Sequence, residues 1–160
     1  MRFKIVSLIA VAGVLAACGT APTSETASTS GSGAGTGAAS IVPGSAEDLK
    51  VNVGDRVFFA FDRYNLTAEA RYTLQQQAAW MAANPAVNVA IEGHCDERGT
   101  REYNLALGER RATAVVDYLS TLGVAANRVS SISYGKERPE DPASNETAWA
   151  KNRRAVTTLK

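Results

Sequence analysis

The sequence predicts an α/β (α+β) domain in which helices pack on one face of a mixed four-stranded sheet. Three observations support this fold class. Strand-like and helix-like segments alternate from residue 56 to residue 159 in the order strand, helix, strand, helix, strand, short helix, strand. The long helical segments carry one apolar stripe each, which suits a helix that covers a sheet. Residues 46–160, about 115 in all, have room for one hydrophobic core.

The first half of this region predicts a strand, a helix and a second strand. Residues 56–61 are dense in valine and phenylalanine and indicate a buried strand. A helix is expected over 66–83, because Thr67 is a suitable N-cap and Pro85 stops the pattern. Residues 87–95 alternate apolar and polar side chains, as a strand does. The buried stripe of the helix is expected to consist of Ala70, Leu74, Ala78 and Met81.

The second half predicts a longer helix and two further strands. The helix is expected over 103–122, and Gly123 ends it. Residues 128–134 indicate a third strand, 146–151 a short helix, and 154–159 the last strand. The core-facing stripe of the long helix is expected to consist of Ala112, Val115, Val116, Leu119 and Leu122.

The N-terminus predicts export and lipid attachment. A short basic start is followed by the apolar run 5–15, which has the length of a signal-peptide core and is too short to span a bilayer. Leu15-Ala16-Ala17-Cys18 resembles the cleavage box of bacterial lipoproteins, which implies that residues 1–17 are removed and that Cys18 is lipidated. Gly19, where an aspartate would favour the inner membrane, implies the outer membrane. The alternative is an ordinary secretory signal with an incidental Cys18.

Residues 18–45 are predicted to be the lipidated cysteine and a flexible linker. Between Gly19 and Ser40 every residue except Glu25 is glycine, alanine, serine, threonine or proline. Such a composition has no large apolar side chain to offset the entropy lost on ordering. Residues 46–160 would then form a single domain facing the periplasm.

Charge excludes one class of partner. The signal peptide would take two of the 17 basic residues with it, leaving 15 against 16 acidic ones. Nucleic-acid binders show a basic excess, so no nucleic acid is expected as a partner. With Cys18 lipidated, Cys95 would have no cysteine to pair with, and no disulfide is expected.

The densest polar cluster follows the second predicted strand, at residues 92–99. Asn104 and Arg111 are seven residues apart, two helical turns, so they share a helix face with Leu107 between them. Ligands of such sheets bind outside the carboxyl ends of the strands. If the strands 56–61 and 87–95 are parallel neighbours, Asp62 joins the same edge.

These side chains suit a zwitterion. Arg111 is expected to take a carboxylate in bidentate fashion, while Asp96 or Asp62 accepts an ammonium group. For any one of these charged residues alone, the alternative is a surface ion pair worth about 0–1 kcal/mol.

Four motifs resemble the OmpA-like domain family, and within it the branch of peptidoglycan-associated lipoproteins. They are residues 93–99, Tyr103-Asn104, residues 107–112 and Asn152-Arg153-Arg154. The resemblance covers essentially the whole folded region, and the cleavage box and linker also match. Gly108 strengthens the resemblance to the lipoprotein branch, since the porin and flagellar-stator branches usually carry serine at this position.

The resemblance implies a ligand and partners. The ligand is the diaminopimelate-containing stem peptide of peptidoglycan, and no cofactor is implied. By matching position, Asp96 would receive the ammonium of the ligand and Arg111 its carboxylate. The partners would be peptidoglycan, the outer membrane through lipid on Cys18, and TolB with other Tol envelope proteins. The remaining pocket residues would be Asp62, Arg98, Asn104 and Leu107, with Gly99 in a loop that adds backbone donors.

A tether between outer membrane and cell wall is the favoured function, and a wall-modifying hydrolase or amidase that uses the acidic loop is the alternative. Asp96 and Glu97 are adjacent, so on extended backbone their carboxylates diverge instead of flanking one bond. His94 is the only histidine, and a metal bound by His94, Cys95 and Asp96 would require consecutive residues to converge. We therefore expect no catalysis and no metal, with His94 packed or hydrogen-bonded in its loop and Cys95 packed.

Overall fold

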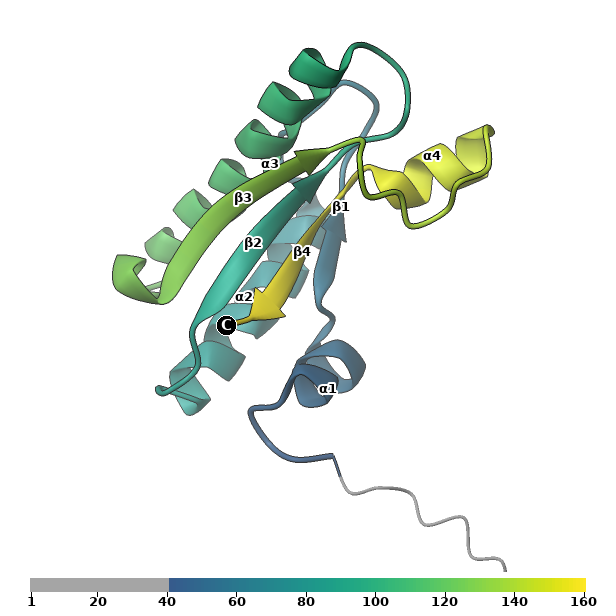
Figure 1. The fold of residues 1–160 in the computed structure, drawn as a ribbon. Helices are drawn as coiled ribbons and strands as arrows, with labels where there is room; N and C mark the ends of the chain where they lie inside the picture. Colours follow the sequence, from purple (N-terminus) through teal and green to yellow (C-terminus); the bar gives the residue numbers. More distant parts are fainter. Residues whose placement is uncertain (1–40) are drawn as a thin grey trace, which may run out of the picture. The chain divides into compact units, whose positions relative to one another are not determined.

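The computed structural model describes residues 41–160, while residues 1–40, with the predicted signal peptide, Cys18 and most of the linker, lie outside the described residues. Figure 1 shows strands and helices in the predicted alternation. The strands are β1 (Arg56–Phe58), β2 (Val89–His94), β3 (Val129–Gly135) and β4 (Arg154–Leu159). The α-helices are α1 (Ala46–Asp48), α2 (Ala68–Ala83), α3 (Arg101–Thr121) and α4 (Glu146–Asn152), with a π-helical turn at Leu49–Val53 and a 3₁₀ turn at Ala126–Arg128.

The four strands form one mixed sheet in the order β1-β4-β2-β3. β4 runs antiparallel to both of its neighbours, and β2 runs parallel to β3. Both long helices, α2 and α3, lie behind the sheet in Figure 1, on the same face. The predicted fold class is therefore confirmed.

The strand order corrects one prediction. β1 and β2 are not parallel neighbours, because the last strand, β4, lies between them. Since both run antiparallel to β4, they still point in the same direction. Their carboxyl ends, and with them Asp62 and the loop after His94, therefore meet at one end of the sheet.

The two long helices begin at threonine caps and bury the predicted stripes. The Thr67 side chain accepts a hydrogen bond from the backbone N–H of Ala70, and Thr100 accepts one from Tyr103, so α3 begins two residues before its predicted start. Leu122 was predicted in the core but is 37% exposed, because it caps the end of α3. The buried residues of the stripes are Ala70, Leu74, Ala78 and Met81 in α2, and Ala112, Val115 and Leu119 in α3, while Val116 is partly buried.

Two further boundaries differ from the predictions. The first strand ends at Phe58 instead of residue 61, although the N–H of Phe59 still donates to the carbonyl of Arg153 at 2.9 Å. Residues 46–53, with no predicted structure, form helical turns that bury Leu49 and are held to α2 by Trp80, whose Nε1 donates to Asp48 at 2.8 Å.

Helix α3 crosses β2 at two glycines. A Cβ atom added at Gly93 would lie 1.9 Å from the carbonyl oxygen of Gly108, and one added at Gly108 would lie 2.3 Å from Oγ of Ser133. Neither position has room for a methyl group without displacing a neighbour. The close approach sets the height of α3 above the sheet and hence the position of the residues that it presents near the end of β2.

Candidate functional site

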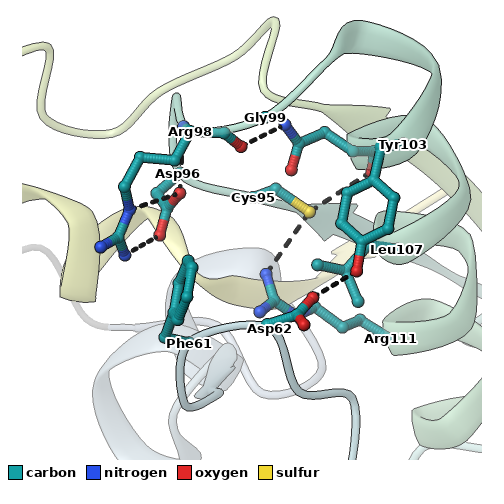
Figure 2. Close-up of a pocket in the computed structure, with 10 residues that line it drawn as sticks. Phe61, Asp62, Cys95, Asp96, Arg98, Gly99, Tyr103, Leu107 and Arg111 are labelled. Carbon is teal, nitrogen blue, oxygen red and sulfur yellow. Dashed lines mark hydrogen bonds and ion pairs between the residues drawn. The ribbon is translucent and has the colours of Figure 1, made fainter.

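A pocket of about 210 Å³ lies where β1 and β2 end and α3 begins. Figure 2 shows its side chains converging from the loop after β1, the loop after β2 and the first half of α3. All seven residues predicted from the sequence line it: Asp62, Asp96, Arg98, Gly99, Asn104, Leu107 and Arg111. The other lining residues are Phe61, Cys95 and Tyr103.

Arg111 is a fully buried cation on the inner wall of this pocket. Nε donates to the carbonyl of Arg63 at 2.8 Å, Nη1 to the carbonyl of His94 at 2.8 Å and to Sγ of Cys95 at 3.4 Å, and Nη2 to the carbonyl of Ala60 at 3.2 Å. Within the described residues, none of these hydrogen bonds ends on a carboxylate. Burial lowers the pKa of Arg111, yet a guanidinium stays charged in proteins, so the pocket wall carries a positive charge that is not hydrogen-bonded to any carboxylate of the described residues.

The same contacts limit how Arg111 can bind an anion. A guanidinium has five N–H donors, and four of them are used within residues 41–160. One Nη2 hydrogen remains. The bidentate carboxylate contact expected from the sequence is therefore reduced to one hydrogen bond supported by charge attraction in a buried setting.

Asp96 is 4% exposed and already has several donors. Oδ1 accepts from the backbone N–H and from Nε of Arg98, both at 3.2 Å, while Oδ2 accepts from Nη2 of Arg98 at 2.6 Å and from Nη1 of Arg153 at 3.4 Å. Burial raises the pKa of Asp96, but the hydrogen bonds from Arg98 outweigh it and hold the pKa below its usual value. The carboxylate is thus ionised and fully engaged at neutral pH.

Arg98 contacts two aromatic rings. Its guanidinium carbon lies 4.0 Å from the ring centre of Phe61 and 4.2 Å from that of Trp149 in α4. Each contact is a cation–π interaction worth about 0.5–1 kcal/mol at a partly exposed site. Nε1 of Trp149 in turn donates to Glu97 at 3.0 Å, so α4 is fastened to the loop after β2.

Asp62 is the exposed carboxylate of the pocket. It has a φ of 56°, a left-handed conformation that aspartate tolerates better than most residues. Its carboxylate accepts a hydrogen bond from the hydroxyl of Tyr103, which joins the loop after β1 to α3 (Figure 2).

The loop between β2 and α3 is fixed from both sides. From α3, Nδ2 of Asn104 donates to the carbonyls of Arg98 at 2.8 Å and Thr100 at 3.1 Å. From the residue after β3, Nζ of Lys136 donates to the carbonyls of Glu97 at 3.0 Å and Gly99 at 2.7 Å. Four hydrogen bonds from outside the loop therefore fix the path of its backbone.

Several residues of this arrangement were not predictable from the sequence. Arg153 belongs to a recognised motif, but only the structure pairs it with Asp96 at 3.4 Å and with Glu146 at 2.8 Å. The roles of Phe61, Tyr103, Lys136 and Trp149 depend on contacts between segments distant in sequence, and no local pattern indicates them.

His94 and Cys95 are buried at the end of β2, and Cys95 also lines the pocket. The His94 ring packs against Tyr134, with 5.5 Å between ring centres, and neither ring nitrogen has a hydrogen-bond partner within residues 41–160. Burial, together with Arg154 and Arg138, lowers the pKa of His94 to about 4. Burial raises the pKa of Cys95 to about 11, so the thiol stays protonated. The expectation of packed residues is confirmed for both.

The low pKa of His94 predicts an acid-dependent loss of stability. In the unfolded chain His94 would protonate near its ordinary pKa of about 6.5, whereas in the fold it protonates only near 4. Stability is therefore lost as the pH falls from 6.5 to 4, by up to about 3 kcal/mol. Urea unfolding at a series of pH values measures this loss. His94→Leu should flatten the profile in that range, and an unchanged slope in the variant would assign the loss to other groups.

Two features are absent from residues 41–160. Within that part of the chain no group of three or more histidine, cysteine, aspartate or glutamate side chains is arranged to hold a metal ion. None of its helices combines the length and the apolar character that a membrane span requires.

Comparison with known proteins places the chain in a family. The model of the OmpA family matches residues 58–153, which include every pocket residue. The chain belongs to the OmpA family. The resemblance stated from the sequence is thereby confirmed.

Relatives within the OmpA family carry one recurrent name. A peptidoglycan-associated lipoprotein of Brucella melitensis biotype 1 is 54% identical over 125 residues, covering 78% of this chain and 74% of the relative. One of Mesorhizobium japonicum is 48% identical over 159 residues, covering 99% and 90%. The crystal structure of the peptidoglycan-associated lipoprotein from Burkholderia pseudomallei is 42% identical, with a TM-score of 0.65 over 66% of this chain and 90% of that one. These relatives are named as lipoproteins, not as enzymes.

Proposed function

We propose that this OmpA-family domain binds peptidoglycan non-covalently, through the diaminopimelate residue of the stem peptide. The observation that carries the proposal is the buried guanidinium of Arg111, which donates to no carboxylate of the described residues and shares one pocket with Asp62 and Asp96. The free end of a diaminopimelate side chain bears an ammonium and a carboxylate on one carbon. A site with a fixed cation and two nearby anions complements that zwitterion.

The wider proposal is a tether. Lipid on Cys18 would hold the outer membrane, the domain at residues 46–160 would face the periplasm and hold the wall, and residues 18–45 would connect them. Because many copies share the load and each is confined near the wall, a modest affinity per pocket suffices. TolB and other Tol envelope proteins are the proposed protein partners, in a system that supports envelope integrity and cell division. The names of the relatives support the lipoprotein and wall-binding parts.

The arrangement of the acidic loop supports binding over hydrolysis. Asp96 is directed to Arg98 and Arg153, while Glu97 accepts from Trp149. An acid and base pair would need two carboxylates aimed at one bond or one water molecule. The two neighbours have separate partners instead, in accord with a non-catalytic role.

Co-sedimentation with purified sacculi tests the proposal. We expect the full chain, kept soluble by mild detergent, to pellet with sacculi that contain diaminopimelate. Sacculi with lysine at that position lack the carboxylate facing Arg111. Binding to them should be weaker by about 10- to 100-fold, because a hydrogen bond between charged groups contributes about 1.5–3 kcal/mol.

The ligand series has internal controls. Sacculi in which the diaminopimelate carboxyl is amidated keep the ammonium and should behave like the lysine type. Equal pelleting with all three materials would contradict recognition of the zwitterion, and release of soluble fragments during incubation would favour the hydrolase or amidase.

A further inference from the structure

Asp96, to which the family resemblance assigns the ammonium group of the ligand, has no vacant acceptor position. A carboxylate offers about four lone-pair positions, and the four hydrogen bonds from Arg98 and Arg153 occupy them. Two of these four donors are side-chain nitrogens of Arg98. A ligand ammonium can therefore bind Asp96 only if the Arg98 guanidinium breaks its hydrogen bonds to this carboxylate and moves away.

A second carboxylate lies close to Arg98. Oε2 of Glu146, in the first turn of α4, lies 3.8 Å from Nη1 of Arg98, a nitrogen that makes no hydrogen bond within residues 41–160. The Glu146 side chain is 65% exposed and does not line the pocket. A shift of about 1 Å would bring this pair to hydrogen-bonding distance.

The surroundings of Arg98 permit that shift. The guanidinium carbon lies 4.0 Å from the ring centre of Phe61 and 4.2 Å from that of Trp149. Cation–π attraction extends to about 6 Å from a ring centre, so a shift of about 1 Å keeps both contacts. Arg153 touches both carboxylates, Asp96 at 3.4 Å and Glu146 at 2.8 Å, and so ties the two acceptors together. Figure 2 shows the arrangement from which this shift would begin: Arg98 is hydrogen-bonded to Asp96 and lies next to Phe61.

We infer that Glu146 is a positioning residue of the binding site. When an ammonium group enters the pocket and binds Asp96, the displaced guanidinium of Arg98 pairs with Glu146 instead. The inference rests on the proposed function. It makes Arg98 an internal cation that competes with the ligand, and Glu146 the residue that lowers the cost of displacing it. Before and after the exchange, each carboxylate has a cationic partner.

A double-mutant cycle tests the inference. The affinity of the full chain in detergent for a stem tripeptide ending in meso-diaminopimelate is measured by calorimetric titration. Glu146→Gln should weaken binding roughly two- to fivefold, in the range of partly exposed ion pairs. Arg98→Met removes the competitor and should tighten binding by a similar factor. In the double variant the Glu146 substitution should have no further effect, because it acts only through Arg98.

Controls separate this exchange from a structural effect. Glu47→Gln removes an exposed glutamate of α1 and should leave the affinity unchanged. Glu146→Gln keeps Asn145, whose side chain caps α4 by accepting from the N–H of Ala148 at 3.0 Å, and thermal unfolding checks that both single variants fold.

Each other outcome overturns the inference. An unchanged affinity in Glu146→Gln would show that Glu146 does not help to displace Arg98. An effect of the Glu146 substitution that persists without Arg98 would show that Glu146 acts through Arg153 or through the stability of the fold. Weaker binding by Arg98→Met would make Arg98 a ligand contact. Failure of the unmodified chain to bind the tripeptide would overturn the proposed function as well, so the two failures are distinguishable.

Discussion

Gly93→Ala is expected to destabilise the domain by at least about 3 kcal/mol. The new Cβ atom would lie 1.9 Å from the carbonyl oxygen of Gly108 and 2.6 Å from its carbonyl carbon. Both are backbone atoms of a long helix, so no rotamer change relieves the clash, and α3 must move away from β2. Overpacking of this kind costs about 1–3 kcal/mol when side chains can adjust, and more when they cannot. Chemical denaturation measures the loss.

The neighbouring glycine provides a graded comparison. A Cβ at Gly108 would meet Oγ of Ser133 at 2.3 Å, and this is a side-chain atom that can be removed. We expect Gly108→Ala to be destabilising and Gly108→Ala with Ser133→Ala to recover part of the stability, whereas Ser133→Ala should not rescue Gly93→Ala. Equal stability of Gly93→Ala and the unmodified chain would show that α3 tolerates a greater distance from the sheet.

Arg111→Met is expected to cost about 3–5 kcal/mol of stability and at least about tenfold in affinity for diaminopimelate-containing sacculi. The guanidinium satisfies the carbonyls of Ala60 and Arg63 in the loop after β1 and of His94 at the end of β2. Its removal leaves these acceptors without a donor and separates the two loops that carry the pocket carboxylates. The same substitution removes the positive charge proposed to face the ligand carboxylate.

Arg110→Met is the matched control for this experiment. Arg110 precedes Arg111 on the same helix, but its side chain is exposed and makes one long hydrogen bond, 3.4 Å, to the carbonyl of Ala106. Its replacement removes the same charge and should change stability by less than about 0.5 kcal/mol. If both variants lose binding equally, net charge and not the buried guanidinium would be responsible. Denaturation and co-sedimentation of the two proteins decide between these explanations.

The helices and strands were predictable because their signals are local. Thr67 and Thr100 cap the long helices, and the spacing of Leu74, Ala78 and Met81 is visible in the sequence. The turns at residues 46–53 were missed because one buried side chain, Leu49, produces no periodicity. The position of β4 between β1 and β2 was missed for another reason: pairing partners are chosen by tertiary packing, and strand patterns alone do not rank them.

The seven candidate site residues were found together because three of them lie in the loop after β2 and three on one face of α3, while Asp62 follows the first strand. Helical spacing alone predicts that Asn104, Leu107 and Arg111 share a face. The state of their charges was not predictable. Arg111 donates four hydrogen bonds to carbonyls and a thiol, and Arg98 is already paired with Asp96. Both arrangements depend on distances between segments that only the folded chain defines.

β1 lies on the line along which mechanical load would pass if the proposed tether is stretched. The chain enters this strand at Arg56 from the N-terminal side, and leaves it toward Phe61 and Asp62 at the pocket. A pull between the anchor and a bound ligand would run along the strand.

The pairing of β1 with β4 opposes such a pull. Hydrogen bonds between antiparallel strands stand perpendicular to them. The ladder from Arg56 to Phe58, extended by the N–H of Phe59 on Arg153 and the N–H of Thr157 on Asp55, would therefore be loaded in shear. Its bonds would then have to fail together and not one after another, so in the proposed tether this short strand would be the joint that bears the force between membrane and wall.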